Sequence, residues 1–195
     1  MTVATIMETR LVRCALSVPA EWPAIFRADV SLVLEPRDAR RYTDAAQALL
    51  SGPPFAVRAE RAAATVTFDL AALPAVLRDD AAMLARRFAA LMGVDNVRLR
   101  VEAIAGDACR KFHADYTDVR LITSWAGPGT DWLPLGAAEG GHRRVPTGWI
   151  GLFKGHLFGE GHPPCIHRSP PISGTGQRRL VLGIDTPARA PAGQG

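Results

Sequence analysis

The clearest periodic pattern of hydrophobic residues lies between residues 74 and 92. Its large apolar side chains recur at helical spacing and define one face: Leu77, Leu84, Phe88 and Leu91. Gly93 follows, and glycine commonly ends a helix because it adopts the left-handed conformation without strain. We therefore expect a helix over 74–92, and a second, Ala-rich helix over 37–50, between Pro36 and the turn at 51–54.

The pattern changes to an alternation after residue 94. Valine, leucine and alanine alternate with arginine and glutamate over 97–103, which indicates a strand with one buried face. Further short strands are expected where β-forming residues lie between turn signals: 109–116, 119–125, 149–154, 165–167 and 180–184. In the N-terminal half we expect a short helical turn at 22–26, a short strand at 30–34 and a weak strand or loop at 64–68.

These elements predict an α+β protein with one domain over residues 1–195. Residues 1–93 are expected to be mainly helical, residues 94–186 to form the β-barrel core, and residues 187–195 to be a flexible tail. Many short strands at turn-rich spacing favour a C-terminal antiparallel double-stranded β-helix of the jelly-roll or cupin-like kind. The N-terminal helices are then expected to pack on one of its sheets.

Composition narrows the functional classes. The net charge is +4, but the arginines are scattered among acidic residues, so we expect no nucleic-acid partner. No apolar run approaches the roughly 18 residues of a membrane span, and residues 1–8 show no signal-peptide pattern, so a cytoplasmic protein without a membrane partner is expected. Three cysteines, Cys14, Cys109 and Cys165, indicate reduced thiols rather than a disulfide framework.

Two segments carry residues suited to metal binding. His113 and Asp115 are two positions apart in a predicted strand, so their side chains should point to the same face. With a distal histidine, His167, they would supply two imidazoles and one carboxylate, the ligand set that suits non-haem Fe(II).

The order of His113, Asp115, His167 and Arg179 resembles the motif order of the Fe(II)/2-oxoglutarate dioxygenases. That resemblance covers about residues 97–185 and implies that the first three residues bind Fe(II). It also implies that Arg179 binds the distal carboxylate of the co-substrate 2-oxoglutarate. The function implied is an oxygenase acting on an unidentified small-molecule or protein substrate.

Four short phrases also resemble an uncharacterised bacterial family, the domain of unknown function family 1826. They are Phe112-His113-Ala114-Asp115, Ala126-Gly127-Pro128-Gly129-Thr130, Phe153-Lys154-Gly155 and His167-Arg168-Ser169-Pro170. The resemblance implies no established activity, although it carries a link with zinc homeostasis. An alternative function is therefore a non-catalytic, zinc-binding protein.

The residues leave the identity of the metal open. Three protein ligands leave coordination positions for a co-substrate and O₂, as a catalytic iron requires. Cys109 and Cys165 share strand parity with His113 and His167, so two thiols could instead complete a closed tetrahedral zinc site. A third alternative is that no metal binds.

Two adjacent arginines, Arg178 and Arg179, must face opposite ways if they lie in a strand. Bulky residues share the face of Arg178, whereas Gly183 shares the face of Arg179 and leaves room for a ligand. We therefore predict that Arg179 points into the barrel and that Arg178 points outwards.

Overall fold

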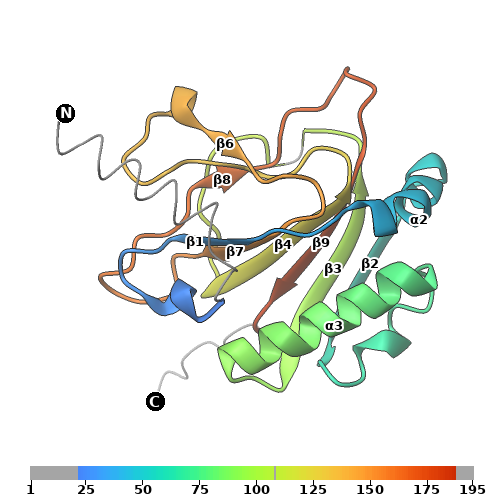
Figure 1. Cartoon of the computed structure of the whole chain (residues 1–195), viewed down its shortest axis with the longest axis horizontal. Helices are drawn as coiled ribbons and strands as arrows, with labels where there is room; N and C mark the ends of the chain where they lie inside the picture. The colour runs from blue at the N-terminus through green and yellow to red at the C-terminus, as the bar shows by residue number, and fades with distance from the viewer. Residues whose placement is uncertain (1–21, 108, 188–195) are drawn as a thin grey trace, which may run out of the picture.

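The computed structural model describes residues 22–107 and 109–187 (Figure 1). In chain order its elements are η1 (Trp22–Phe26), β1 (Leu32–Glu35), α2 (Arg40–Ser51), β2 (Ala56–Ala62), η2 (Val66–Phe68), α3 (Ala75–Met92), β3 (Asn96–Ile104), β4 (Val119–Ala126), β5 (Asp131–Trp132), η3 (Glu139–Gly141), β6 (Arg143–Arg144), β7 (Ile150–Lys154), β8 (His167–Arg168) and β9 (Arg179–Asp185). The predictions for residues 1–8, Cys14 and the tail beyond residue 187 lie outside the described residues.

Two antiparallel sheets form the β part of this mixed α/β protein. The larger sheet has six strands in the order β1-β7-β4-β9-β3-β2, and the smaller has three in the order β6-β5-β8. Strand neighbours in the larger sheet are distant in sequence, and the last strand, β9, lies at its centre between β3 and β4.

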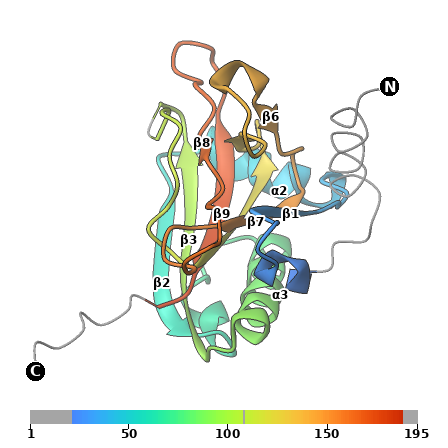
Figure 2. The same ribbon diagram turned by 90° about the vertical axis from the view of Figure 1, so that its left-hand side faces the viewer.

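Two helices lie on one side of the larger sheet (Figure 2). The face that they contact is apolar because β9 alternates, with Leu180, Leu182 and Ile184 fully buried on this side. These side chains share one core with the buried residues of α2 and α3. We call this the outer face, and we call the opposite face, which carries Arg120 and Ile122 of β4, the inner face.

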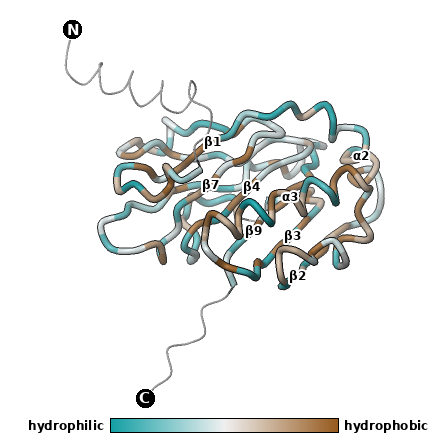
Figure 3. The backbone as a smooth tube through the Cα atoms, turned by 60° about the horizontal axis from the view of Figure 1, so that its bottom comes forward, coloured by the Kyte–Doolittle hydropathy of each residue, from teal (hydrophilic) through white to brown (hydrophobic). Residues whose placement is uncertain are grey.

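Along α3, hydrophobic residues are interspersed with hydrophilic ones, as expected of a helix with one buried side (Figure 3). The helix spans Ala75–Met92, within the predicted range, and Gly93 ends it in the left-handed conformation with φ 66°. In the described residues, no helix is both long and apolar enough to cross a membrane.

A buried network of hydrogen bonds around Asp80 connects α2 and α3 to strand β4 of the larger sheet. The Asp80 carboxylate of α3 accepts hydrogen bonds from Arg37 at 2.7 Å and from the Tyr42 hydroxyl at 2.8 Å. Its other oxygen accepts one from the Trp125 indole of β4 at 2.7 Å. Each of these donors meets an acceptor, which is the condition under which buried polar groups are tolerated.

Some elements differ from the sequence-based prediction. Strand β2 was not predicted, because its alternation of alanine and charged residues carries no strong β-former pattern; it is an edge strand with its side chains largely exposed. The segment predicted as a weak strand or loop contains the short 3₁₀ turn η2.

Candidate metal centre

His113 and His167 lie opposite each other across an isolated antiparallel bridge. The amide of His113 donates to the carbonyl of His167 at 2.9 Å, and the amide of His167 donates back at 2.8 Å. The predicted strand around His113 is therefore wrong: only His113 makes a strand-like pairing, and Asp115 lies in the loop that follows. The two histidines are brought together by this pairing of distant segments.

The loop that carries Asp115 is held by the segment after β7. The amide of His156 donates to the carbonyl of Asp115 at 2.8 Å, and the amide of Gly155 donates to Asp118 at 2.8 Å. A Cβ atom at Gly155 would lie 2.1 Å from the carbonyl oxygen of Thr117, so only glycine allows this close approach. The glycine thereby sets the position of the Asp115 backbone.

The three side chains converge on one point. Ligand atoms of His113, Asp115 and His167 all lie within 4.8 Å of one another. Nε2 of His167 is 3.1 Å from Oδ2 of Asp115, and Nε2 of His113 is 3.6 Å from Oδ1. His167 is buried, whereas the side chain of His113 is 37% exposed, so the cluster opens towards solvent on the His113 side.

The hydrogen-bond pattern around the rings fits a cation. Nδ1 of His113 lies 2.8 Å from the carbonyl oxygen of Lys111, and Nδ1 of His167 lies 3.1 Å from that of Cys165. A carbonyl only accepts, so we assign a proton to both Nδ1 atoms, and in the neutral rings each Nε2 then presents a lone pair to Asp115. The buried Oδ2 of Asp115 has no hydrogen-bond donor. Three converging lone pairs repel one another unless protons or a metal ion lie between them, so these residues fit a divalent metal.

Arg120 of β4 orients the carboxylate. It donates to Oδ1 of Asp115 at 2.8 Å and makes a two-point ion pair with Asp185 of β9, at 2.7 and 2.8 Å. Burial would raise the pKa of Asp115, but the neighbouring His167 and the charge of Arg120 outweigh it and lower the pKa to about 2. Because Arg120 contacts Oδ1, the other oxygen, Oδ2, remains directed at His167.

The two cysteines do not join the three ligands, which corrects the closed zinc arrangement. In the described part of the chain, the metal-ligand group contains His113, Asp115 and His167 alone. Cys109 is exposed and has a left-handed backbone with φ 60°, so strand parity does not apply to it. Cys165 is buried, and burial raises the pKa of its thiol, which disfavours the thiolate that zinc binds.

Arg179 lies on the inner face and is fully buried, with 1% of its surface exposed. One guanidinium nitrogen donates to the hydroxyls of Ser124 and Thr130, each at 3.1 Å. Its Nε and its other terminal nitrogen are buried and have no acceptor. Burial lowers the pKa of Arg179 to about 10, so the group stays charged at neutral pH. A buried guanidinium with free donors is suited to an anionic ligand.

On β9, the surface between Arg179 and the metal-ligand cluster is open at Gly183. Gly183 lies on the same face of β9 as Arg179 and Asp185, and a Cβ atom there would meet nothing within 4 Å. Arg178 lies on the other side of the strand, half-buried beside α2. The structure thus separates the two adjacent arginines between the two faces of the sheet.

Several side chains of the site were not identified from the sequence. Arg120 and Asp185 form an ion pair between two strands, and Phe153 packs against His167 in a tilted arrangement with ring centroids 4.8 Å apart. Ser124 and Thr130 bind Arg179. Nothing in the sequence pairs β4 with β9, so the only available signal was the period-two placement of Arg120 and Ser124 along one predicted strand.

Solved structures with a similar fold include two that are described as dioxygenases for auxin oxidation. A dioxygenase for auxin oxidation from rice superposes with a TM-score of 0.55 at 14% identity, over 89% of this chain and 80% of that one. The Arabidopsis thaliana dioxygenase for auxin oxidation 1, in complex with 2-oxoglutarate, gives 0.54 at 9% identity over 84% and 86%. JOX2, in complex with 2-oxoglutarate, iron and JA, gives 0.52 at 9% identity over 94% and 71%.

At these identities the likeness shows a shared fold and not an activity. No curated protein sequence matches the chain. The family model described as "Protein of unknown function (DUF1826)" matches residues 25–185, and the chain belongs to that family.

Proposed function

We propose that this protein is a non-haem Fe(II)/2-oxoglutarate-dependent oxygenase. The observation that carries the proposal is the pair of unsatisfied groups on the inner face. Lone pairs from His113, Asp115 and His167 converge on one point, and two buried nitrogens of the Arg179 guanidinium have no acceptor among the protein's own groups. A ferrous ion and a dicarboxylate would satisfy both, with the open space over Gly183 between them.

In this proposal the two sheets form a double-stranded β-helix, with the helices packed on its larger sheet. Arg179 binds the distal carboxylate of 2-oxoglutarate, and Ser124 and Thr130 hold the guanidinium in place. Arg120 keeps Asp115 oriented towards the ion through Oδ2. When bound, the ferrous ion with 2-oxoglutarate supplies the activation of O₂ for oxidation of a second substrate.

Each part of the site also has a defined role before any reaction. The backbone carbonyls that accept from Nδ1 fix both imidazoles with Nε2 towards the ion. Phe153 covers one side of His167 and excludes water there. The exposed side of His113 is the route by which an ion and a substrate reach the centre.

Measurements of metal binding and then of co-substrate binding test the proposal. Protein purified without a metal-affinity tag is titrated anaerobically with Fe(II) and then with 2-oxoglutarate, and succinate is measured after O₂ is admitted. We expect one ion per chain, 2-oxoglutarate binding that depends on the ion, and succinate formation. His113→Ala should abolish the stoichiometric ion.

His142→Ala is the matched control, because the Nδ1 atom of His142 also lies near a backbone carbonyl oxygen, that of Glu139, but its side chain lies outside the cluster. This variant should bind iron as the parent does. Equal iron stoichiometry in the parent and His113→Ala would refute the metal centre. Iron binding without any 2-oxoglutarate binding would refute the oxygenase.

A further inference from the structure

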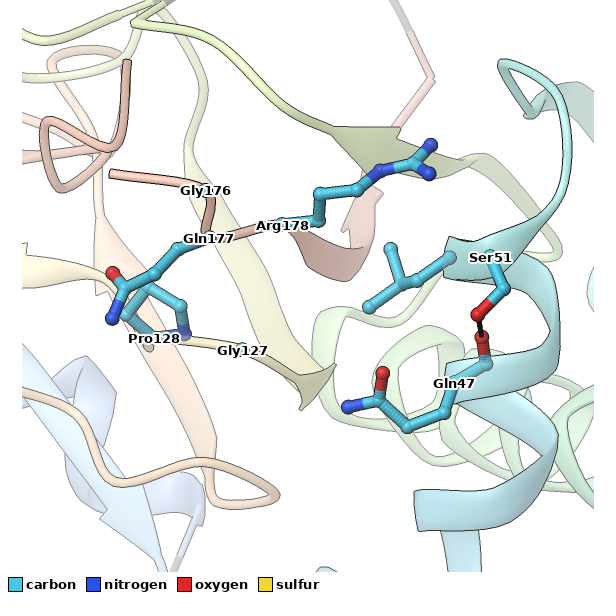
Figure 4. A pocket seen from close by; sticks show the side chains of 8 residues that line it. Gln47, Ser51, Gly127, Pro128, Gly176, Gln177 and Arg178 are labelled. Carbon is cyan, nitrogen blue, oxygen red and sulfur yellow. Dashed lines mark hydrogen bonds between the residues drawn. The ribbon is translucent and has the colours of Figure 1, made fainter. Parts of the chain in front are cut away.

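A hollow of about 570 Å³ lies beside the C-terminal end of α2, on the outer face of the larger sheet (Figure 4). Its polar side chains do not meet at one point, because the guanidinium of Arg178 points away from the amides of Gln47 and Gln177. One nitrogen of Arg178 instead donates to the carbonyl of Gly52, at 3.4 Å. We assign no ligand to this hollow. Side chains do converge on the smaller sheet, next to the two histidines of the metal centre.

On the smaller sheet, the buried carboxylate of Asp131 accepts hydrogen bonds from two arginines. Asp131 of β5 lies opposite Arg144 of β6 and Arg168 of β8. Its Oδ1 accepts from Nε of Arg144 at 2.7 Å, and its Oδ2 accepts from Nε of Arg168 at 3.3 Å. Successive residues of a strand point to opposite faces, so these three side chains lie on the face away from that of His167. We call this the rear face of the smaller sheet.

Arg168 also contacts the segment that carries His113. Its guanidinium carbon lies 4.3 Å from the centroid of the Phe112 ring, within the range of a cation–π interaction. Phe112 directly precedes His113, and Arg168 directly follows His167. The contact therefore joins the two histidine-bearing segments on the rear face.

The backbone connection between these two segments is short. Within the described residues, the reciprocal pair of hydrogen bonds between His113 and His167 is accompanied only by one from the Ser169 amide to the Cys109 carbonyl, at 3.0 Å. Such a bridge opens readily, because few hydrogen bonds have to break together. Metal–ligand distances, however, tolerate deviations of only about 0.2 Å. A side-chain contact next to the bridge limits this opening.

We propose that Asp131, Arg168 and Phe112 are positioning residues for the metal centre. The Asp131 carboxylate holds the Arg168 guanidinium over the Phe112 ring through a charge-assisted hydrogen bond. This contact in turn keeps His113 opposite His167, with both imidazoles on the other face. The inference rests on the proposed function, in which these two histidines bind the metal ion.

Arg144 and Arg168 form a matched pair for the test. Both donate to the carboxylate of Asp131, and Arg144 makes the shorter hydrogen bond. Arg168 contacts Phe112, whereas Arg144 lies on β6, which carries none of the three metal ligands. If Asp131 had a purely structural role, loss of either arginine should have a similar effect. The proposal instead predicts that loss of Arg168 alone disturbs the metal centre.

Amide hydrogen exchange, measured by NMR on the full-length protein without metal, tests the positioning directly. In Arg168→Met and in Phe112→Leu, the amides of His113 and His167 should exchange about five- to tenfold faster, since the bridge opens more often. Arg168→Lys retains a cation that can lie over the ring, so it should keep most of the protection. In Arg144→Met both amides should exchange at the rate of the parent protein.

Anaerobic titration with Fe(II) measures the consequence for the metal. Arg168→Met, Phe112→Leu and Asp131→Asn should each lower the affinity about tenfold. The double variant of Arg168 and Phe112 should lose no more than either single variant, because both substitutions remove the same contact. Arg144→Met should bind Fe(II) as the parent does.

Two results would overturn the positioning role: equal losses in Arg144→Met and Arg168→Met, or unchanged exchange and affinity in Arg168→Met. Fully additive losses in the double variant would also contradict it, since the two side chains would then act separately. A parent protein that binds no Fe(II) would refute the metal centre instead. The exchange rates of His113 and His167 would still show whether Arg168 and Phe112 hold the bridge.

Discussion

Two buried polar networks, one on each face of the larger sheet, differ in whether their charged groups are fully hydrogen-bonded. On the outer face, Asp80 is buried but receives hydrogen bonds from Arg37, Tyr42 and Trp125, so both charges of this network, Asp80 and Arg37, have partners. On the inner face, Oδ2 of Asp115 lacks a donor and two nitrogens of Arg179 lack acceptors. Both networks contain a buried aspartate and an arginine.

We interpret the fully hydrogen-bonded network as structural and the network with unpaired groups as a binding site. A closed network contributes to stability, because removing one partner leaves another buried and uncompensated. An open network lowers the stability of the free protein and is tolerated where a ligand completes it. Substitutions on the two faces should therefore have opposite effects on stability and binding.

The largest effect is expected from Asp80→Ala. Its removal leaves Arg37, Tyr42 and Trp125 without their common acceptor, and the free energy of unfolding should fall by about 3–5 kcal/mol. Chemical denaturation measures the change. Asp79→Ala, at the exposed neighbouring position of α3, should change it by less than about 0.5 kcal/mol. Equal losses in both variants would mean that the network is not closed.

Arg179→Met should weaken ligand binding without lowering the stability of the free protein. We expect 2-oxoglutarate binding to weaken by about 2–3 kcal/mol, since a charge-assisted hydrogen bond is lost, while the stability of the free protein stays the same or rises. Calorimetric titration and thermal unfolding measure the two quantities. Arg178→Met should bind 2-oxoglutarate almost normally. A large stability loss in Arg179→Met would contradict the open network.

Arg120→Lys tests whether the orientation of Asp115 matters to the metal. Lysine keeps the charge but cannot span Asp115 and Asp185 with a planar fork, so metal affinity should fall by about 10–100-fold. A competition titration with a metal indicator measures it. Arg110→Lys, in the preceding loop, is the control and should leave metal affinity unchanged. An unchanged affinity in Arg120→Lys would limit the role of Arg120 to stability.

Gly183→Ala should give the smallest change. A methyl group there meets no atom within 4 Å, and the backbone conformation suits alanine, so stability should rise by about 0.4–1 kcal/mol. The same group narrows the space beside Arg179 and should weaken 2-oxoglutarate binding. Gly127→Ala, where φ is 76° and the backbone of Arg178 is too close, should be destabilising. Destabilisation by Gly183→Ala would show that the inner face is closed.

The spacing of hydrophobic residues along the sequence predicted the elements whose conformation depends on nearby residues. The helix α3 follows from the spacing of Leu77, Leu84 and Phe88 and from Gly93 as its end. The alternation of β3 and β9 predicted which side chains share a face, including the separation of Arg178 from Arg179. These features depend on neighbours within a few positions.

Other features depend on contacts between distant segments. The parity argument for Cys109 failed because a left-handed residue interrupts the segment, and Asp115 lies in a loop whose position is set by Gly155. The pairing of Arg120 with Asp185 requires β4 and β9 to be neighbours. Strand β2 is held by its pairing with β3 rather than by its own composition.

The reciprocal amide bonds between His113 and His167 have a consequence for assembly. The two imidazoles meet only when the segments that carry them are paired, so the unfolded chain presents no preformed centre. A cation that binds there therefore stabilises the pairing between the segments that carry His113 and His167. At a free concentration of one hundred times its dissociation constant, it would add about 2.7 kcal/mol to the stability of the folded state.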